Sequence, residues 1–107
     1  GLPVNGADGV SGGTVVDLWV DRAEMLFRYL ELDVSTGAGT RRVLLPINFT
    51  RIGREGVMVK SILGAQFALV PATREPERVT LLEEEKIMAY FGGGVLYAEP
   101  SRQEPLI

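Results

Sequence analysis

The sequence contains no cysteine and no histidine. Without cysteine, the chain has no disulfide framework and no thiolate metal site. Without histidine, it lacks the most common general base and the most common transition-metal ligand. The motifs G-x-S-x-G, Walker A, H-E-x-x-H and G-x-G-x-x-G are also missing. We therefore expect a protein that is not an enzyme; the one catalytic alternative is a small hydrolase that uses Asp21 and Glu24.

The chain has no excess of basic residues and no long apolar run. Eleven Lys and Arg stand against fourteen Asp and Glu, which gives a net charge of −3. This balance gives nucleic-acid binding little electrostatic support. No apolar segment approaches the ~20 residues of a membrane-spanning helix. With 107 residues, of which 46% are hydrophobic, we expect one globular domain with one core.

Short alternating segments rich in β-branched and aromatic residues predict a mainly β domain. A hairpin loop is expected at 35–40, and Gly56 favours a tight turn after Arg54 and Glu55. Such closely spaced strands predict a small closed β-barrel of about five to six antiparallel strands. The expected strands lie at 14–20, 26–34, 41–46, 49–53 and 57–63, and a helical turn is expected within 64–72.

Strand alternation also predicts which side chains share a face. In the first strand, Val16, Leu18 and Val20 fall on one face, and Trp19 falls on the outer one. In the second strand, Arg28 has the parity of the core-facing leucines. A guanidinium on that parity is unusual, because buried charges require partners.

A helix is predicted near the C-terminus of the sequence. Thr80 and Glu83 form a capping box, the helix follows over 81–91, and Gly92–Gly94 is expected to end it. The mostly apolar run Ile87–Phe91 wraps the whole helix circumference, so we expect it to be covered on more than one side. Either the barrel and the segment after the glycines cover it, or part of it docks on another protein.

These patterns divide the chain into four parts. We expect a Gly-rich linker at 1–12, the barrel at 13–79, the helix and its following segment at 80–98, and a tail at 99–107.

The joint between the first two predicted strands gathers acidic and basic groups. Asp21 and Glu24 are three residues apart, and Arg28 lies four residues beyond Glu24. The ordinary interpretation is a surface turn with exposed salt bridges, each worth under ~1 kcal/mol. In a partly buried setting with ordered water, the same groups would form a proton relay, because neighbouring carboxylates and an arginine shift proton affinity in opposite directions.

Four stretches of the sequence together resemble one family. The resemblance runs from Gly1 to Ala98, and the pieces "WVDRAE…RYLE" and "TLLEEEKI" followed by "GGGVLYA" are its most specific parts. The chain resembles the cytoplasmic domain of the H subunit of the purple-bacterial photosynthetic reaction centre. The stretches are "GTVVDLWVDRAEMLFRYLELDV", "RRVLLPINFTRI", "ILGAQFALVP" and "VTLLEEEKIMAYFGGGVLYA".

The resemblance implies a fold, a place and a role. The fold would be a PRC-barrel followed by a C-terminal helix, taken from a longer chain that begins with a membrane helix. The domain would cap the L and M subunits at the cytoplasmic face of the bacterial inner membrane, while the fragment itself would be soluble. It would bind no cofactor, since bacteriochlorophyll, bacteriopheophytin, quinone and iron belong to the partner subunits. Without the L and M subunits, the isolated fragment would tend to self-associate.

The resemblance also implies roles for four residues in proton transfer to the secondary quinone. Glu24 would be the principal relay group, Asp21 a neighbouring carboxylate that tunes it, and Arg28 a charge partner of either. Glu84 would belong to the same electrostatic network. Ala23 stands where the family pattern often has proline, so the turn is expected to be looser here. The alternative is a stand-alone PRC-barrel adaptor that binds a soluble protein.

Overall fold

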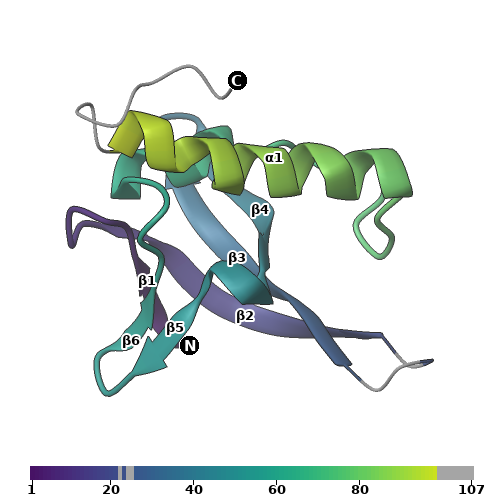
Figure 1. Ribbon diagram of the computed structural model, residues 1–107, viewed down its shortest axis with the longest axis horizontal. Helices are drawn as coiled ribbons and strands as arrows, with labels where there is room; N and C mark the ends of the chain where they lie inside the picture. Colours follow the sequence, from purple (N-terminus) through teal and green to yellow (C-terminus); the bar gives the residue numbers. More distant parts are fainter. Residues whose placement is uncertain (22, 24–25, 99–107) are drawn as a thin grey trace.

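The computed structural model describes residues 1–21, 23 and 26–98, and for 94–98 the backbone alone. Six strands form one sheet, and a long helix lies across one side of it (Figure 1). The mainly β prediction with a C-terminal helix is confirmed. The expected closed, all-antiparallel barrel is corrected: the sheet is open, in the order β4-β3-β2-β1-β6-β5, and β1 pairs with β6 in parallel.

The sheet begins earlier in the chain than predicted. β1 (Pro3–Asn5) lies between β2 (Ser11–Asp21) and β6 (Gly56–Met58), and Val4 is fully buried. The expected loop over 1–12 is therefore wrong for 3–5 and for the first residues of β2. Alternation over three residues is too short a signal, and the parallel partner of β1 is more than fifty residues away in sequence.

The centre of the sheet is one long hairpin extended by a third strand. β2 pairs with β3 (Leu26–Thr36), and β3 pairs with β4 (Gly39–Pro46). The predicted turn between β3 and β4 is confirmed and is tighter than expected, with Gly39 at φ 133°, a region that favours glycine. The predicted stop of the third strand at Pro46 is also confirmed.

A second, short hairpin completes the sheet. β5 (Arg51–Gly53) pairs antiparallel with β6, and a two-residue turn joins them. Gly56 has φ 122°, and a Cβ there would lie 2.5 Å from the Pro3 carbonyl oxygen. The glycine is thus required both by the turn and by the close approach of β1.

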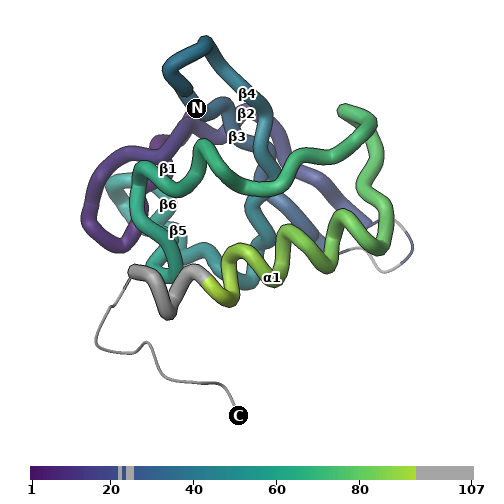
Figure 2. The backbone as a smooth tube through the Cα atoms, turned by 90° about the horizontal axis from the view of Figure 1, so that it is seen from above, coloured from purple at the N-terminus to yellow at the C-terminus, as the bar shows by residue number. Residues whose placement is uncertain are grey.

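Two short 3-10 helices lie in the connections: Ile47–Phe49 joins β4 to β5, and Gly64–Leu69 lies between β6 and the helix. The second confirms the helical turn expected within 64–72. Seen from above, the chain after β6 crosses the molecule to the start of α1 (Leu81–Ala98), which then returns in the opposite direction (Figure 2).

Helix α1 begins as predicted and ends later than predicted. The Thr80 hydroxyl accepts a hydrogen bond from the Glu83 amide at 3.2 Å, and Glu83 accepts one from the Thr80 amide at 2.9 Å. This is the expected capping box. The expected end at Gly92–Gly94 is wrong, because the helix continues to Ala98. The expectation that the segment after the glycines folds back over the helix is therefore also wrong.

The core lies between the curved sheet and α1. Phe91 stacks on Phe49 and packs edge-on against Phe67, with ring centroids 5.8 and 6.1 Å apart. The prediction that the barrel covers the apolar part of α1 is confirmed for Ile87 and Phe91, whereas Ala89 is exposed. The fully buried large side chains are Phe67, Phe91, Leu32, Leu45, Ile62, Ile87, Val4, Val57, Val59, Val70 and Pro46.

The face assignment of β2 is reversed relative to the prediction. Val16, Leu18 and Val20 are exposed, while Trp19 packs against the core. Alternation itself persists, because Val15 and Trp19 are partly buried while Val16, Leu18 and Val20 are all exposed. The sequence pattern separated the two faces but did not indicate which of them lies on the core.

Candidate functional site

Arg28 and Glu84 form the ion pair at the centre of the candidate site. Arg28 is the third residue of β3, and Glu84 lies in the first turn of α1. Arg28 Nη2 donates to Glu84 Oε1 at 2.5 Å, with the two side chains 39% and 27% exposed. The Glu84 carboxylate is the largest cause that raises the pKa of Arg28 above its usual value. Of the four predicted site residues, these two are in direct contact.

Asp21 lies at the end of β2, beside the same pair. Its Oδ1 accepts a hydrogen bond from the Ala23 amide at 3.0 Å, which shapes the turn after the strand. Its negative charge also contributes to raising the pKa of Arg28, although less than Glu84 does. Arg28 has Glu84 as a hydrogen-bonded partner, which the expected pairing with Glu24 or Asp21 did not include. Glu24 lies outside the described residues.

Tyr29 is a member of this site that the sequence analysis did not identify. Its ring is 3% exposed and meets Trp19 edge-on, with centroids 6.2 Å apart. Burial, reinforced by the Glu84 charge, raises the pKa of Tyr29 to about 12, while Arg28 opposes this rise. Among the described residues its hydroxyl makes no hydrogen bond of normal geometry, although the Glu84 and Arg28 side chains lie close to it. Simple alternation placed Tyr29 opposite the core, so no signal marked it as buried.

A pocket of about 270 Å³ opens between β3, the chain after β4, and α1. Its walls combine the charged pair with apolar side chains, so polar and apolar groups face the same space. The lining residues are Phe27, Arg28, Tyr29, Pro46, Ile47, Asn48, Glu84 and Met88.

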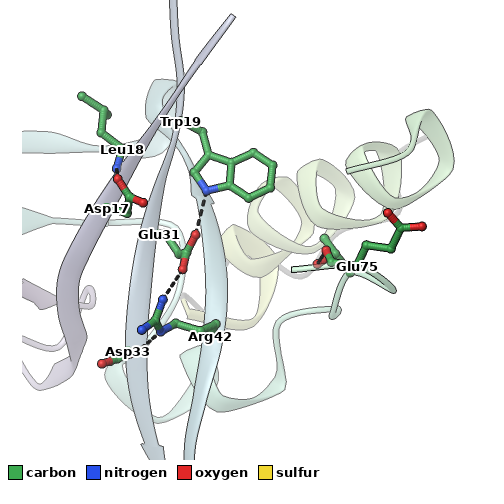
Figure 3. Close-up of polar contacts among 8 residues, drawn as sticks. Asp17, Leu18, Trp19, Glu31, Asp33, Arg42 and Glu75 are labelled. Atoms are coloured by element: carbon green, nitrogen blue, oxygen red, sulfur yellow. Dashed lines mark hydrogen bonds and ion pairs between the residues drawn. The ribbon is translucent and has the colours of Figure 1, made fainter. Parts of the chain in front are cut away.

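A second polar cluster lies on the central strands (Figure 3). Trp19 Nε1 donates to Glu31 Oε1 at 2.7 Å, and Arg42 bonds both Glu31 Oε2 and Asp33 Oδ1. The bond to Glu31 is the largest cause that raises the pKa of Arg42, and the bond to Asp33 is the next. Glu31 is buried but fully engaged, so we interpret the cluster as a structural clamp. Asp33 and Arg42 are direct cross-strand partners, a pairing that the hairpin register could have indicated.

Glu83, which precedes Glu84 in the sequence, stabilises the start of α1. Besides closing the capping box, its carboxylate accepts a hydrogen bond from the Arg74 amide at 2.6 Å. The Thr80 and Arg74 amides lower the pKa of Glu83. Glu83 therefore anchors the start of α1, and this fixes the helix that presents Glu84.

Exposed apolar side chains lie on β2 and β3, the strands that lead to Arg28. We call the exposed large apolar residues of β2 and β3 the hairpin surface, and its most exposed members, Leu26 and Phe27, are 52% and 58% exposed. Phe27 also lines the pocket beside Arg28. The hairpin surface consists of Val16, Leu18, Val20, Leu26 and Phe27.

Two further properties concern a metal site and a membrane-spanning helix. Among residues 1–21, 23 and 26–98, no three acidic side chains come together in a way that would hold a metal ion. No helix in the same part of the chain is long and apolar enough to cross a membrane.

Comparison with known families agrees with the architecture. A family model for the PRC-barrel domain matches residues 1–66, which is more than half of the chain and includes all six strands. The chain therefore belongs to the PRC-barrel family, whose domains are in general non-catalytic.

Proposed function

We propose that this PRC-barrel is a non-catalytic subunit domain that caps the cytoplasmic quinone side of a purple-bacterial photosynthetic reaction centre. It stabilises the core of L and M subunits and assists proton delivery to the secondary quinone during light-driven electron transfer. The sequence stretches that resemble the H subunit motivate this assignment, and the arrangement of the hairpin surface and the Arg28–Glu84 pair supports it.

The observation that carries the proposal is a charged site that directly follows exposed apolar residues in β3. Phe27 is 58% exposed and follows directly after Leu26, which is 52% exposed. Arg28, the next residue, makes the ion pair with Glu84. Apolar residues flanking a fixed arginine contact are typical of protein interfaces, where aromatic and Arg side chains concentrate. A membrane-subunit partner that covers this surface would also cover the charged site.

Covering the site changes its chemistry. In water, an ion pair with side chains 39% and 27% exposed is weakened by solvent. Under a partner subunit, the local dielectric constant falls and each charge acts more strongly on its neighbours. Carboxylates that lie beside an arginine and ordered water can then take up and release protons in sequence. Asp21 and Glu84 are the described carboxylates available for this step, and Glu24 is assigned to it by resemblance.

The second candidate function is a stand-alone adaptor that docks a soluble protein. The hairpin surface would serve an adaptor equally well, because exposed apolar patches mark interaction sites of many kinds. The two functions differ in what they require of the charged site. An adaptor needs only the surface, whereas a reaction-centre cap needs the carboxylates as well.

The test is to replace single carboxylates in the intact reaction centre and to follow proton-coupled reduction of the secondary quinone after light flashes. We expect Glu24→Gln and Glu84→Gln to slow this step and to change its dependence on pH. Glu75→Gln, on the loop before α1 and not among the residues that line the pocket of the pair, is the matched control and should leave the rate unchanged. Rates equal to the wild type in both site variants would refute the relay role.

A further inference from the structure

The pocket beside Arg28 and Glu84 contains a hydroxyl group to which the resemblance assigns no role. Tyr29 lines this pocket and is 3% exposed. Its Oη atom is buried and makes no hydrogen bond of normal geometry among the described residues, although Glu84 and Arg28 lie close to it. Buried polar groups in native proteins nearly always have a partner, and ordered water is a common one. The hydroxyl therefore points to a ligand of the pocket.

The surroundings of the hydroxyl offer further hydrogen-bonding groups. Arg28 has five N–H donors, and its bond to Glu84 uses Nη2. The Glu84 carboxylate engages Arg28 through Oε1, and Asn48 adds a side-chain amide at the pocket wall. Both charged groups lie close to the phenol, because Glu84 raises the pKa of Tyr29 and Arg28 lowers it. Donors and acceptors thus surround the same space, and the Arg28–Glu84 pair as a whole carries no net charge.

These groups fit water better than an ion. An anion would meet the Glu84 carboxylate, and a cation would meet the Arg28 guanidinium, whereas water both donates and accepts. A buried water needs two to four polar partners and a share of roughly 30 Å³. A pocket of about 270 Å³ has room for several such molecules.

We propose that the pocket binds a short chain of water molecules that joins the Tyr29 hydroxyl to Glu84 and Arg28, and that neutral Tyr29 is a third proton-carrying side chain of the site. The water site stands on the geometry of the pocket. The proton-carrying role rests on the proposed function.

The proton step at Tyr29 is balanced without any charged intermediate on the phenol. A water on one side receives a proton from the solvent end of the water chain and passes one of its protons to a lone pair of Tyr29 Oη. At the same time the phenolic O–H bond breaks, and its proton passes through the next water to the Glu84 carboxylate. One O–H bond forms as one breaks, and the hydroxyl is ready again once it has rotated.

The first arm of the experiment is a high-resolution crystal structure of the chain and of Tyr29→Phe. We expect ordered waters within hydrogen-bond distance of Tyr29 Oη and of Glu84 in the wild type. The variant should lose the water next to the hydroxyl and should keep the Arg28–Glu84 pair. A pocket without ordered water, or one filled by a polar side chain of a neighbouring protein, would overturn the water site.

The second arm uses the intact reaction centre. Tyr29→Phe should slow proton-coupled quinone reduction about tenfold, less than loss of a positioned acid–base group usually costs, because pocket water replaces part of the path. Tyr90→Phe is the matched control, since the Tyr90 hydroxyl donates to the Gln66 carbonyl at 2.7 Å. A normal rate in Tyr29→Phe beside slowed Glu84→Gln removes Tyr29 from the relay and leaves the proposed function standing. Normal rates in Tyr29→Phe, Glu84→Gln and Glu24→Gln together remove the relay as a whole.

Discussion

The buried phenol of Tyr29 makes the stability of the protein depend on pH in the alkaline range. Its pKa is about 12, against an ordinary value of 10.0, because burial and then the Glu84 charge disfavour the phenolate. The unfolded chain ionises this phenol near pH 10, whereas the folded chain keeps it protonated. Between these values the unfolded state binds fewer protons, so the free energy of unfolding falls as the pH rises.

The size of this effect follows from the two pKa values. One pKa unit corresponds to about 1.4 kcal/mol, so Tyr29 contributes about 3 kcal/mol that is fully present below pH 10 and lost above pH 12. About half of this loss is expected by pH 11. Tyr29→Phe has no phenol to ionise, and its stability should decline correspondingly less over the same range.

Urea unfolding at fixed pH, followed by the far-ultraviolet circular dichroism of α1, measures this difference. The two proteins should show curves of stability against pH that separate from pH 10 upward. Tyr90→Phe is a useful comparison, since burial raises the pKa of Tyr90 as well and its loss isolates the contribution of a second phenol. Parallel curves for wild type and Tyr29→Phe between pH 9 and pH 12 would refute the account of Tyr29 as a buried phenol.

Three further substitutions test neighbouring parts of the structure. Glu84→Gln removes a negative charge that raises the pKa of Tyr29, so that pKa should fall, as measured by nuclear magnetic resonance of the tyrosine ring carbons. Phe91→Ala removes a fully buried ring from the core and should lower the free energy of unfolding by about 3–5 kcal/mol in urea titrations. Glu31→Gln, at a buried carboxylate bonded by two side chains, should cost about 1–2 kcal/mol. Its matched control is Asp33→Asn at a more exposed position, which should cost less than about 1 kcal/mol in the same titration.

Local sequence signals predicted the elements whose cause is local. The capping box of Thr80 and Glu83 placed the start of α1, since both hydrogen bonds lie within one helical turn. The turn at Gly56 and the strand end at Pro46 were likewise predicted from one or two residues. Each of these features depends on chemistry that neighbouring residues supply.

Tertiary contacts decided the features that were predicted wrongly. The run Gly92–Gly94 costs helix propensity, about 1 kcal/mol per glycine. Phe91, buried against Phe49 and Phe67, anchors the helix just before the run, and the helix continues through it. Sequence periodicity contains no record of this packing.

The same distinction applies to the candidate site. Arg28 and Glu84 were both named from the sequence, yet their contact spans 56 positions along the chain and followed from no spacing rule. Tyr29 was missed because residues 29–32 of β3 are buried on both faces, so alternation there does not separate buried from exposed side chains. The sequence identified the residue types of the site, but only the fold shows that these residues come together.

The central claim is that a reaction-centre core covers the hairpin surface and the Arg28–Glu84 site. Amide hydrogen exchange of this chain, alone and after mixing with an L–M core that lacks its H subunit, tests the claim most directly. We predict strong protection of the amides of residues 15–21 and 26–30 and of the first turns of α1, and little change in the β5–β6 hairpin. Unchanged exchange in the β2–β3 hairpin, in the presence of excess core, would contradict the account.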